Sequence, residues 1–192
     1  MVPVIAEVSV EIHLNGEKII ASACTGKHLD ELAVGFLRSE GIISALADIK
    51  EVIVEEDARI VKVYTTGTTG FSAAEYHERK TIAAGGARIG APDHAGAGKT
   101  SLVHQSLPIR AAQAIELMEQ LLNAGLLHNE THGTHCSGLG VPDGMICIRE
   151  DIGRHNTIDM LGGYALLHKI DLTDKILLTT GRISTEMAAK AW

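Results

Sequence analysis

Two glycine–arginine turns in this chain each join a strand-like segment to a helix-like segment. The first is Glu150-Asp-Ile-Gly-Arg-His-Asn156 and the second is Thr180-Gly-Arg-Ile-Ser184. Each follows a short apolar run and leads into a segment with the character of a helix. Such a turn can present backbone N–H groups, a helix N-terminus and a guanidinium to one ligand, which is a usual way to hold a phosphate. Two such turns predict a polyanionic, nucleotide-like ligand.

The side chains of these turns are the first candidates for binding that ligand. We expect it to contact Arg154, His155, Asn156, Gly181 and Arg182. Asp151 and Asn156 have a simpler alternative role, because both residue types commonly cap helix N-termini. Arginine and histidine are not required for capping, and Gly153 indicates a special backbone geometry. We therefore favour ligand binding for this cluster.

The first third of the chain has the pattern of a small sheet. Residues 4–14 alternate apolar and polar side chains and end at Asn15-Gly16, which predicts a β-hairpin. A helix is expected next, with Gly41 as its end, and a second strand pair over residues 51–65. We therefore predict a small N-terminal β-rich α+β part over residues 1–66, built on a curled antiparallel sheet.

The remainder of the chain predicts a layered α/β domain. Residues 67–105 are rich in Gly, Ala and Thr without periodicity and are predicted to form a loop. A helix is expected from Ser106 to Gly125. After it we expect a loop at 128–137, strands at 138–141 and 144–149, a helix at 155–168, a strand at 175–180 and a helix from 184. Alternating strands and helices favour a layered, largely parallel α/β sheet over residues 106–192.

The charge and composition exclude several classes of protein. The chain has 192 residues, a formal net charge of −7 at pH 7 and 45% hydrophobic residues. It has no basic excess to neutralise a phosphate backbone, so we expect no bulk binding of nucleic acid. No run approaches the roughly 18 apolar residues of a membrane span, and no signal segment is recognisable at the N-terminus. Three cysteines without paired spacing predict a reducing cytoplasm rather than a disulfide framework.

The segment Thr131-His-Gly-Thr-His-Cys136 contains residue types that zinc prefers as ligands. With His155 it could supply four ligands, but no second cysteine pair supports such a site, and we predict no bound metal. Cys136 directly follows His135, and a nearby imidazolium or arginine would lower the pKa of its thiol and make it nucleophilic. The alternative is an ordinary, partly buried thiol. The other two cysteines lie in apolar, strand-like runs and are expected in the core.

Four groups of residues resemble motifs of the FdhD/NarQ family of formate dehydrogenase accessory proteins, or sulfur carrier proteins. They are Cys24-Thr25 with Asp30-Glu-Leu-Ala-Val-Gly-Phe-Leu-Arg-Ser-Glu-Gly-Ile42, then Thr131 to His135, then Glu150 to Asn156 with Asp159, and Gly181-Arg-Ile-Ser184 with Glu186, Met187 and Lys190. They occur in the family's order and extend over nearly the whole chain. Together they are specific, whereas any one alone would be weak.

The resemblance implies a cytoplasmic homodimer whose larger domain is similar to the cytidine deaminase fold. Family members take sulfur from a cysteine desulfurase as a persulfide on a loop cysteine. They pass it to the molybdenum or tungsten bis-pterin guanine dinucleotide cofactor, which the formate dehydrogenase apoenzyme needs for activity. On this chain, the resemblance implies that the cofactor is bound by His135, Arg154, His155, Asn156, Gly181 and Arg182.

Two departures from the family pattern concern the sulfur step and the length of the chain. The family's persulfide cysteine falls in the stretch Thr81-Ile-Ala-Ala-Gly-Gly-Ala87, where this chain has Gly86. Glycine cannot carry a persulfide. Family members also continue past the last helix predicted here, so we expect a shortened chain or one that a partner chain completes.

Three hypotheses for function remain open at this point. In the first, the protein is a sulfurtransferase in which Cys136 or Cys24 replaces the loop cysteine, Cys136 being the better placed. In the second, it is a catalytically silent chaperone that binds and delivers the cofactor. The most distant is a metal-dependent hydrolase of deaminase-like fold that uses His132, His135 and Cys136.

Overall fold

The structure is a computed structural model that describes residues 3–67, 81–82, 88–89 and 107–191. Its helices and strands are β1 (Val8–Leu14), β2 (Glu17–Cys24), α1 (Leu29–Ser39), a 3₁₀ turn (Leu46–Asp48), β3 (Ile49–Glu55), β4 (Ile60–Thr65), β5 (Thr81–Ile82), β6 (Arg88–Ile89), α3 (Ala111–Ala124), α4 (Leu126–Thr131), β7 (His135–Val141), β8 (Gly144–Asp151), α5 (Arg154–Leu167), β9 (Ile176–Thr179) and α6 (Thr185–Ala191). The predicted mixed α/β class is confirmed.

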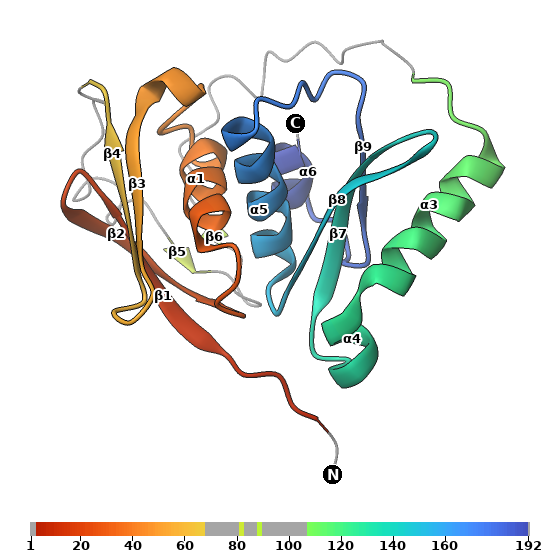
Figure 1. Ribbon diagram of the computed structural model, residues 1–192, viewed down its shortest axis with the longest axis horizontal. Helices are drawn as coiled ribbons and strands as arrows, with labels where there is room; N and C mark the ends of the chain where they lie inside the picture. The colour runs from red at the N-terminus through yellow and green to blue at the C-terminus, as the bar shows by residue number, and fades with distance from the viewer. Residues whose placement is uncertain (1–2, 68–80, 83–87, 90–106, 192) are drawn as a thin grey trace.

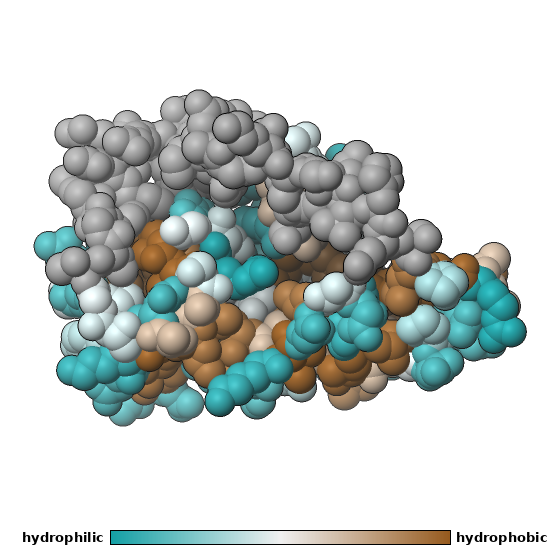
Figure 2. Space-filling model, turned by 90° about the horizontal axis from the view of Figure 1, so that it is seen from above, coloured by the Kyte–Doolittle hydropathy of each residue, from teal (hydrophilic) through white to brown (hydrophobic). Residues whose placement is uncertain are grey.

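The elements form layers in which two sheets enclose a pair of helices. Figure 1 shows the sheet of β1 to β4 on one side, α1 and α5 beside each other in the middle, and the sheet of β7 to β9 beyond them. Helix α3 covers the outer face of that second sheet. On the face shown in Figure 2, hydrophilic and hydrophobic side chains are interspersed rather than gathered into one hydrophilic surface.

The N-terminal sheet has the strand order β2-β1-β4-β3. The predicted hairpin is confirmed: β1 and β2 are joined at Asn15 and Gly16, whose φ angles of 50° and 91° are those of a tight hairpin turn. The second hairpin, β3 and β4, joins the first through a parallel pairing of β1 with β4. Both hairpins are antiparallel, as expected, but the sheet as a whole is mixed rather than antiparallel. Helix α1 separates the two hairpins and lets the second one pair in this direction.

The C-terminal sheet has the order β8-β7-β9, and both of its pairings are antiparallel. The expectation of a largely parallel sheet is therefore wrong. The tight connection between Val141 and Gly144 makes β7 and β8 a hairpin, which must be antiparallel. Strands β8 and β9 still run in the same direction, on either side of β7, with α5 as the connection between them.

Two boundaries differ from the sequence-based prediction. Helix α3 begins at Ala111, after an extended Arg110, rather than near Ser106, which lies outside the described residues. The predicted loop at 128–137 contains the end of α4 and the start of β7. The backbone N–H groups of Leu127 and His128 donate to the Glu150 carboxylate at 3.2 and 2.9 Å, and this distant partner stabilises the extra helical turn.

Helices α1 and α5 are in contact along their backbones, and two glycines make this possible. A Cβ atom on Gly35 would lie 1.7 Å from the carbonyl oxygen of Asp159, and one on Gly163 would lie 1.9 Å from that of Glu31. These contacts pair the end of one helix with the start of the other, so the two helices are antiparallel. The close contact fixes the N-terminal end of α5 relative to the N-terminal sheet. Met160 of α5 is part of the core beneath that sheet.

Among the described residues, no helix is long and apolar enough to cross a membrane. The predicted division into residues 1–66, 67–105 and 106–192 stays a prediction.

Candidate functional site

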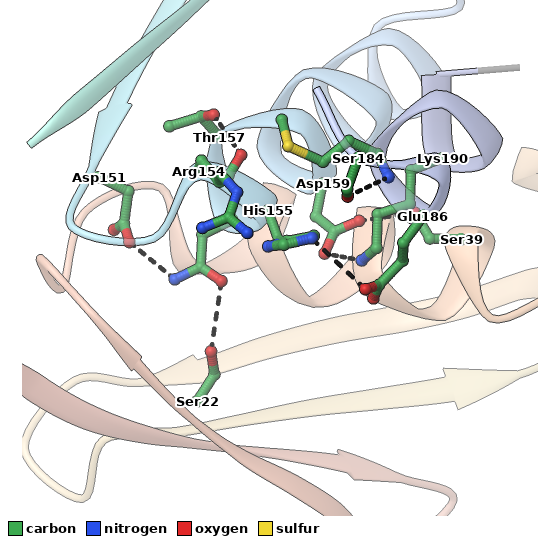
Figure 3. A network of polar contacts seen from close by, with 12 residues as sticks. Ser22, Ser39, Asp151, Arg154, His155, Thr157, Asp159, Ser184, Glu186 and Lys190 are labelled. Atoms are coloured by element: carbon green, nitrogen blue, oxygen red, sulfur yellow. Dashed lines mark hydrogen bonds and ion pairs between the residues drawn. The ribbon is translucent and has the colours of Figure 1, made fainter. Parts of the chain in front are cut away.

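A crevice of about 310 Å³ lies between β2 and the N-terminal ends of α5 and α6. Its volume is in the range of small-molecule sites. The residues lining it are Ile20, Ala21, Ser22, Ala23, Phe36, Glu40, His135, Ile152, Gly153, Arg154, His155, Asn156, Asp159, Glu186 and Lys190. Four of the predicted site residues are therefore brought together here, namely His135, Arg154, His155 and Asn156. Figure 3 shows the polar side chains of this region.

The two glycine–arginine turns lie against each other beside the crevice. A Cβ atom on Gly181 would be 3.0 Å from the Cβ of Arg154. A row of hydroxyl groups connects the turns: Thr179 Oγ1 accepts from the Gly181 N–H at 3.1 Å and from Ser137 Oγ at 2.9 Å. Ser137 Oγ also lies 2.7 Å from Thr157 Oγ1, which donates to the Arg154 carbonyl at 2.8 Å. The predicted juxtaposition of the two turns therefore agrees with the geometry.

Arg154 and Arg182 both affect the pKa of the His135 imidazole. Burial lowers the pKa of His135, and the positive charges of Arg154, His128 and Arg182 lower it further. His135 is therefore neutral near pH 7. The Arg182 side chain is exposed, and Gly181 and Arg182 lie next to the crevice rather than among the residues that line it.

Two buried nitrogen atoms in the crevice wall lack a hydrogen bond within the part of the chain that the structure describes. They are Nε of Arg154 and Nε2 of His155. The nearest carboxylate to the latter is Glu186, with Oε2 at 3.5 Å. Burial lowers the pKa of His155, and Glu186 partly opposes this. A buried donor without a partner costs about 1–3 kcal/mol, so unpaired atoms in a crevice wall indicate that something else pairs with them.

Asp151 and Asn156 hold the first turn to β2. Asp151 accepts from the backbone N–H and hydroxyl of Thr25 at 2.8 and 3.0 Å. The amide of Asn156 donates to Asp151 at 2.7 Å and to the Ala23 carbonyl at 2.8 Å. The helix cap itself is Gly153, without a side-chain bond. These contacts use the amide nitrogen of Asn156, which therefore positions the turn. Asp151 also accepts from the backbone N–H of Gly153, the N-cap residue of α5, at 3.0 Å. The capping alternative therefore holds in part for Asp151.

The sequence-based prediction missed four charged residues of the crevice, namely Glu40, Asp159, Glu186 and Lys190. Asp159 is 3% exposed and accepts from Ser39 Oγ and from Lys190 Nζ, both at 2.6 Å. Glu186 and Lys190 come from α6 and close the far end of the crevice. All four residues stand in the motif strings that carry the family resemblance, which was the available signal.

Cys136 is not placed as a nucleophile. It is 1% exposed, and its Sγ lies 3.4 Å from Glu150 Oε1. Burial first, and then the negative charge of Glu150, raise the pKa of Cys136 to about 12. The expectation of a lowered pKa is therefore wrong. Side chains alternate along a strand, so that His135 reaches the crevice while Cys136 packs on the opposite face, against Leu117 and Leu121 of α3.

Cys24, Cys147 and His132 are not among the residues that line the crevice. Cys24 and Cys147 are buried, as expected, and burial raises the pKa of each to about 11. Gly86 lies outside the described residues. Within residues 3–67 and 107–191, no three His, Cys, Asp or Glu side chains are grouped as metal ligands. His132 packs its ring against that of His128, with centroids 5.6 Å apart.

Comparisons with known proteins show the family of this chain and a similar fold. The FdhD/NarQ family matches residues 5–192. A protein of Geobacillus kaustophilus named sulfur carrier protein FdhD is 33% identical over 186 residues, which cover 96% of this chain and 70% of the relative. A protein of the same name from Bacillus pumilus is 34% identical over 194 residues, covering 98% of this chain and 72% of the relative. The chain belongs to the FdhD/NarQ family.

A solved structure is also similar. It is a protein from Desulfotalea psychrophila described as a formate dehydrogenase accessory protein, with a TM-score of 0.71 and 24% sequence identity. The match covers 99% of this chain and 70% of that one. At this identity the likeness concerns the fold alone. The similarity to the cytidine deaminase fold stays a prediction.

Proposed function

We propose that this protein serves a formate dehydrogenase as an accessory protein. Its crevice binds the molybdenum (or tungsten) bis-pterin guanine dinucleotide cofactor, which is then delivered to the apoenzyme. Relatives named sulfur carrier protein FdhD, and a similar fold described as a formate dehydrogenase accessory protein, support this assignment. By the same resemblance the protein is a cytoplasmic homodimer.

The observation that carries the proposal is the donor set at one end of the crevice. Nε of Arg154 and Nε2 of His155, which lack a hydrogen bond among the described residues, lie at the N-terminus of α5, next to the second turn with Arg182. A diphosphate presents only acceptors and negative charge. Guanidinium groups, a neutral imidazole N–H and a helix N-terminus suit such a ligand.

The sulfur step is the second part of the proposal. As a sulfur carrier, the protein would accept sulfur from a cysteine desulfurase on a thiol and pass it to the bound cofactor. Cys136 is the candidate carrier on the sequence, but its burial and raised pKa disfavour the thiolate.

The second candidate function is a catalytically silent chaperone that binds the cofactor without transferring sulfur. One observation favours it: all three cysteines of the chain are buried, with pKa values raised to about 11 or 12. Incubation with a cysteine desulfurase and cysteine, followed by mass spectrometry, separates the two functions. A sulfur carrier gains the mass of one sulfur atom on a cysteine-containing peptide, whereas a silent chaperone gains none.

Cofactor binding is tested with guanosine diphosphate (GDP), which reproduces one nucleotide end of the cofactor. We expect GDP to bind measurably by titration calorimetry. Guanosine, which lacks the phosphates, should bind at least about 100-fold more weakly, since two charge-assisted contacts at about 1.5–3 kcal/mol each are lost. Equal affinity for GDP and guanosine would contradict an anion-binding crevice.

A further inference from the structure

The end of the crevice away from the arginine turns carries negative charge. Asp159 at this end is neutralised, because it accepts from both Lys190 and Ser39 at 2.6 Å. Glu186 is different. One of its oxygens, Oε2, faces His155 at 3.5 Å, and the other makes no hydrogen bond to any residue that the structure describes. Its side chain is 30% exposed, so one edge of a carboxylate is open to the crevice.

His155 lies between the cationic and the acidic groups of the crevice. Figure 3 shows Arg154, His155 and Glu186 in this order, all directed into the same space above β2. The Nε2 atom of His155 is buried and has no hydrogen bond among the described residues. Because the His155 ring is largely buried and its Nε2 lies 3.5 Å from Glu186 Oε2, it restricts the position of the Glu186 carboxylate. Phe36, which is 7% exposed, adds apolar surface at this end.

We infer that Glu186 is the specificity-determining residue of the crevice, and that its carboxylate binds the amino-bearing edge of guanine. This inference rests on the proposed function. Guanine presents a ring N–H and an exocyclic amino group side by side, and both are donors. A carboxylate has two acceptor oxygens and no donor, so it pairs with this edge in a bidentate way. Adenine has a ring acceptor at the corresponding position and is rejected.

The arrangement assigns one end of the ligand to each end of the crevice. The phosphates lie at the N-terminus of α5 with Arg154, and the base lies at Glu186 and Phe36. A site whose acceptor atom receives a hydrogen bond from a donor group of the ligand rejects an analogue that lacks this donor group, because the acceptor is then left unpaired. Inosine diphosphate (IDP) is that analogue: it keeps the ring N–H and the phosphates of GDP and lacks only the amino group.

The test is the ratio of GDP to IDP affinity, measured by titration calorimetry on the wild type and on Glu186→Gln. We expect the wild type to prefer GDP by about tenfold or more. In the variant, the amide can no longer accept from both donors, so the preference should disappear and GDP should lose more affinity than IDP. Glu119→Gln, on the exposed side of α3, is the matched control and should keep the wild-type ratio.

A structural role for Glu186, acting only through His155, would lower the affinities for GDP and IDP by the same factor. An unchanged ratio in Glu186→Gln would therefore overturn the inference and leave the proposed function intact. A wild type that binds neither nucleotide would overturn both. Thermal melts of the two variants show whether each is folded, and the conservative substitutions keep side-chain volume constant.

Discussion

Gly181 lies so close to Arg154 that a single methyl group would displace the arginine. A Cβ at position 181 would be 3.0 Å from the Cβ and 3.4 Å from the Cδ of Arg154. Gly181 does not have a positive φ, so alanine introduces no backbone strain there. We expect Gly181→Ala to fold normally and to weaken GDP binding by about 1 kcal/mol, or roughly fivefold. Wild-type affinity measured by calorimetry would mean that the guanidinium position is unimportant.

Three histidines make the stability depend on pH. Burial lowers the pKa values of His28, His135 and His155 below the usual 6.5. Between 6.5 and those lower values the unfolded chain binds more protons than the folded one, so the free energy of unfolding falls as the pH drops. Carboxylates with lowered pKa values, such as Glu11, reduce the free energy of unfolding only as the pH falls below about 4.5.

We therefore expect a lower urea midpoint at about pH 5.5 than at about pH 7.5, and a smaller difference between the two in His155→Gln. A midpoint that stays constant or rises on acidification would show that these imidazoles are not held neutral by the fold.

Sequence patterns predicted some of the individual residues of the candidate site. The glycine–arginine turns predicted Arg154 and His155, which line the crevice, and Arg182, which lies next to it. Arginine and histidine have few structural reasons to stand in such turns. Asn156 lines the crevice, and its predicted contact with the ligand stays a prediction, while its amide nitrogen is bonded to Asp151 and Ala23. The bond to Ala23 depends on the position of β2, and β2 is distant in the sequence.

The contact between α1 and α5 gives a sharp prediction for these helices. A methyl group on Gly163 would lie 1.9 Å from a carbonyl oxygen of α1, a contact that no side-chain movement can relieve. We expect Gly163→Ala to lower the free energy of unfolding by at least about 3 kcal/mol, as overpacking does in tight cores. Urea denaturation followed by circular dichroism measures this.

The neighbouring Gly162 provides the control. A Cβ there would meet only the Arg38 guanidinium, at an ordinary 3.6 Å. Gly162→Ala should therefore stabilise α5 by about 0.5–1 kcal/mol, since alanine is the better helix former. Similar effects of the two substitutions would contradict the close helix crossing.

Individual elements were predicted best where the signal is local. The Asn15-Gly16 hairpin and the helix ending before Gly41 are set by nearby residues and are confirmed. Helix α4 was missed because Glu150, a residue of β8, caps it. The sheet direction was wrong because alternating strands and helices outweighed the short connection between Val141 and Gly144 in the prediction.

The whole crevice depends on long-range packing. Its floor comes from β2 and α1, near the start of the chain, and its cationic wall comes from α5 and the strands before it. The contacts of Gly35 with α5 and of Asn156 with β2 bring these parts together. No sequence pattern expresses such contacts, so the sequence predicted one wall of the site and not the space in front of it.

The reactivity of the cysteines also depends on the fold of the whole molecule. The neighbourhood of Cys136 in the sequence, next to His135, indicated a reactive thiol. In the fold it lies on the other face of β7, under α3 and beside Glu150. The crevice and the thiols are thus separate features, which is why cofactor binding and sulfur transfer require separate experiments.

The central claim is that both arginine turns bind one diphosphate. Titration of GDP into three single variants tests this claim most directly. Arg154→Ala and Arg182→Ala should each lower the affinity roughly 10- to 100-fold, as expected for the loss of one charge-assisted contact. Lys50→Ala, which removes an exposed charge from β3 at the far edge of the N-terminal sheet, should bind GDP like the wild type. Unchanged affinity in both arginine variants, or an equal loss in all three, would contradict the account.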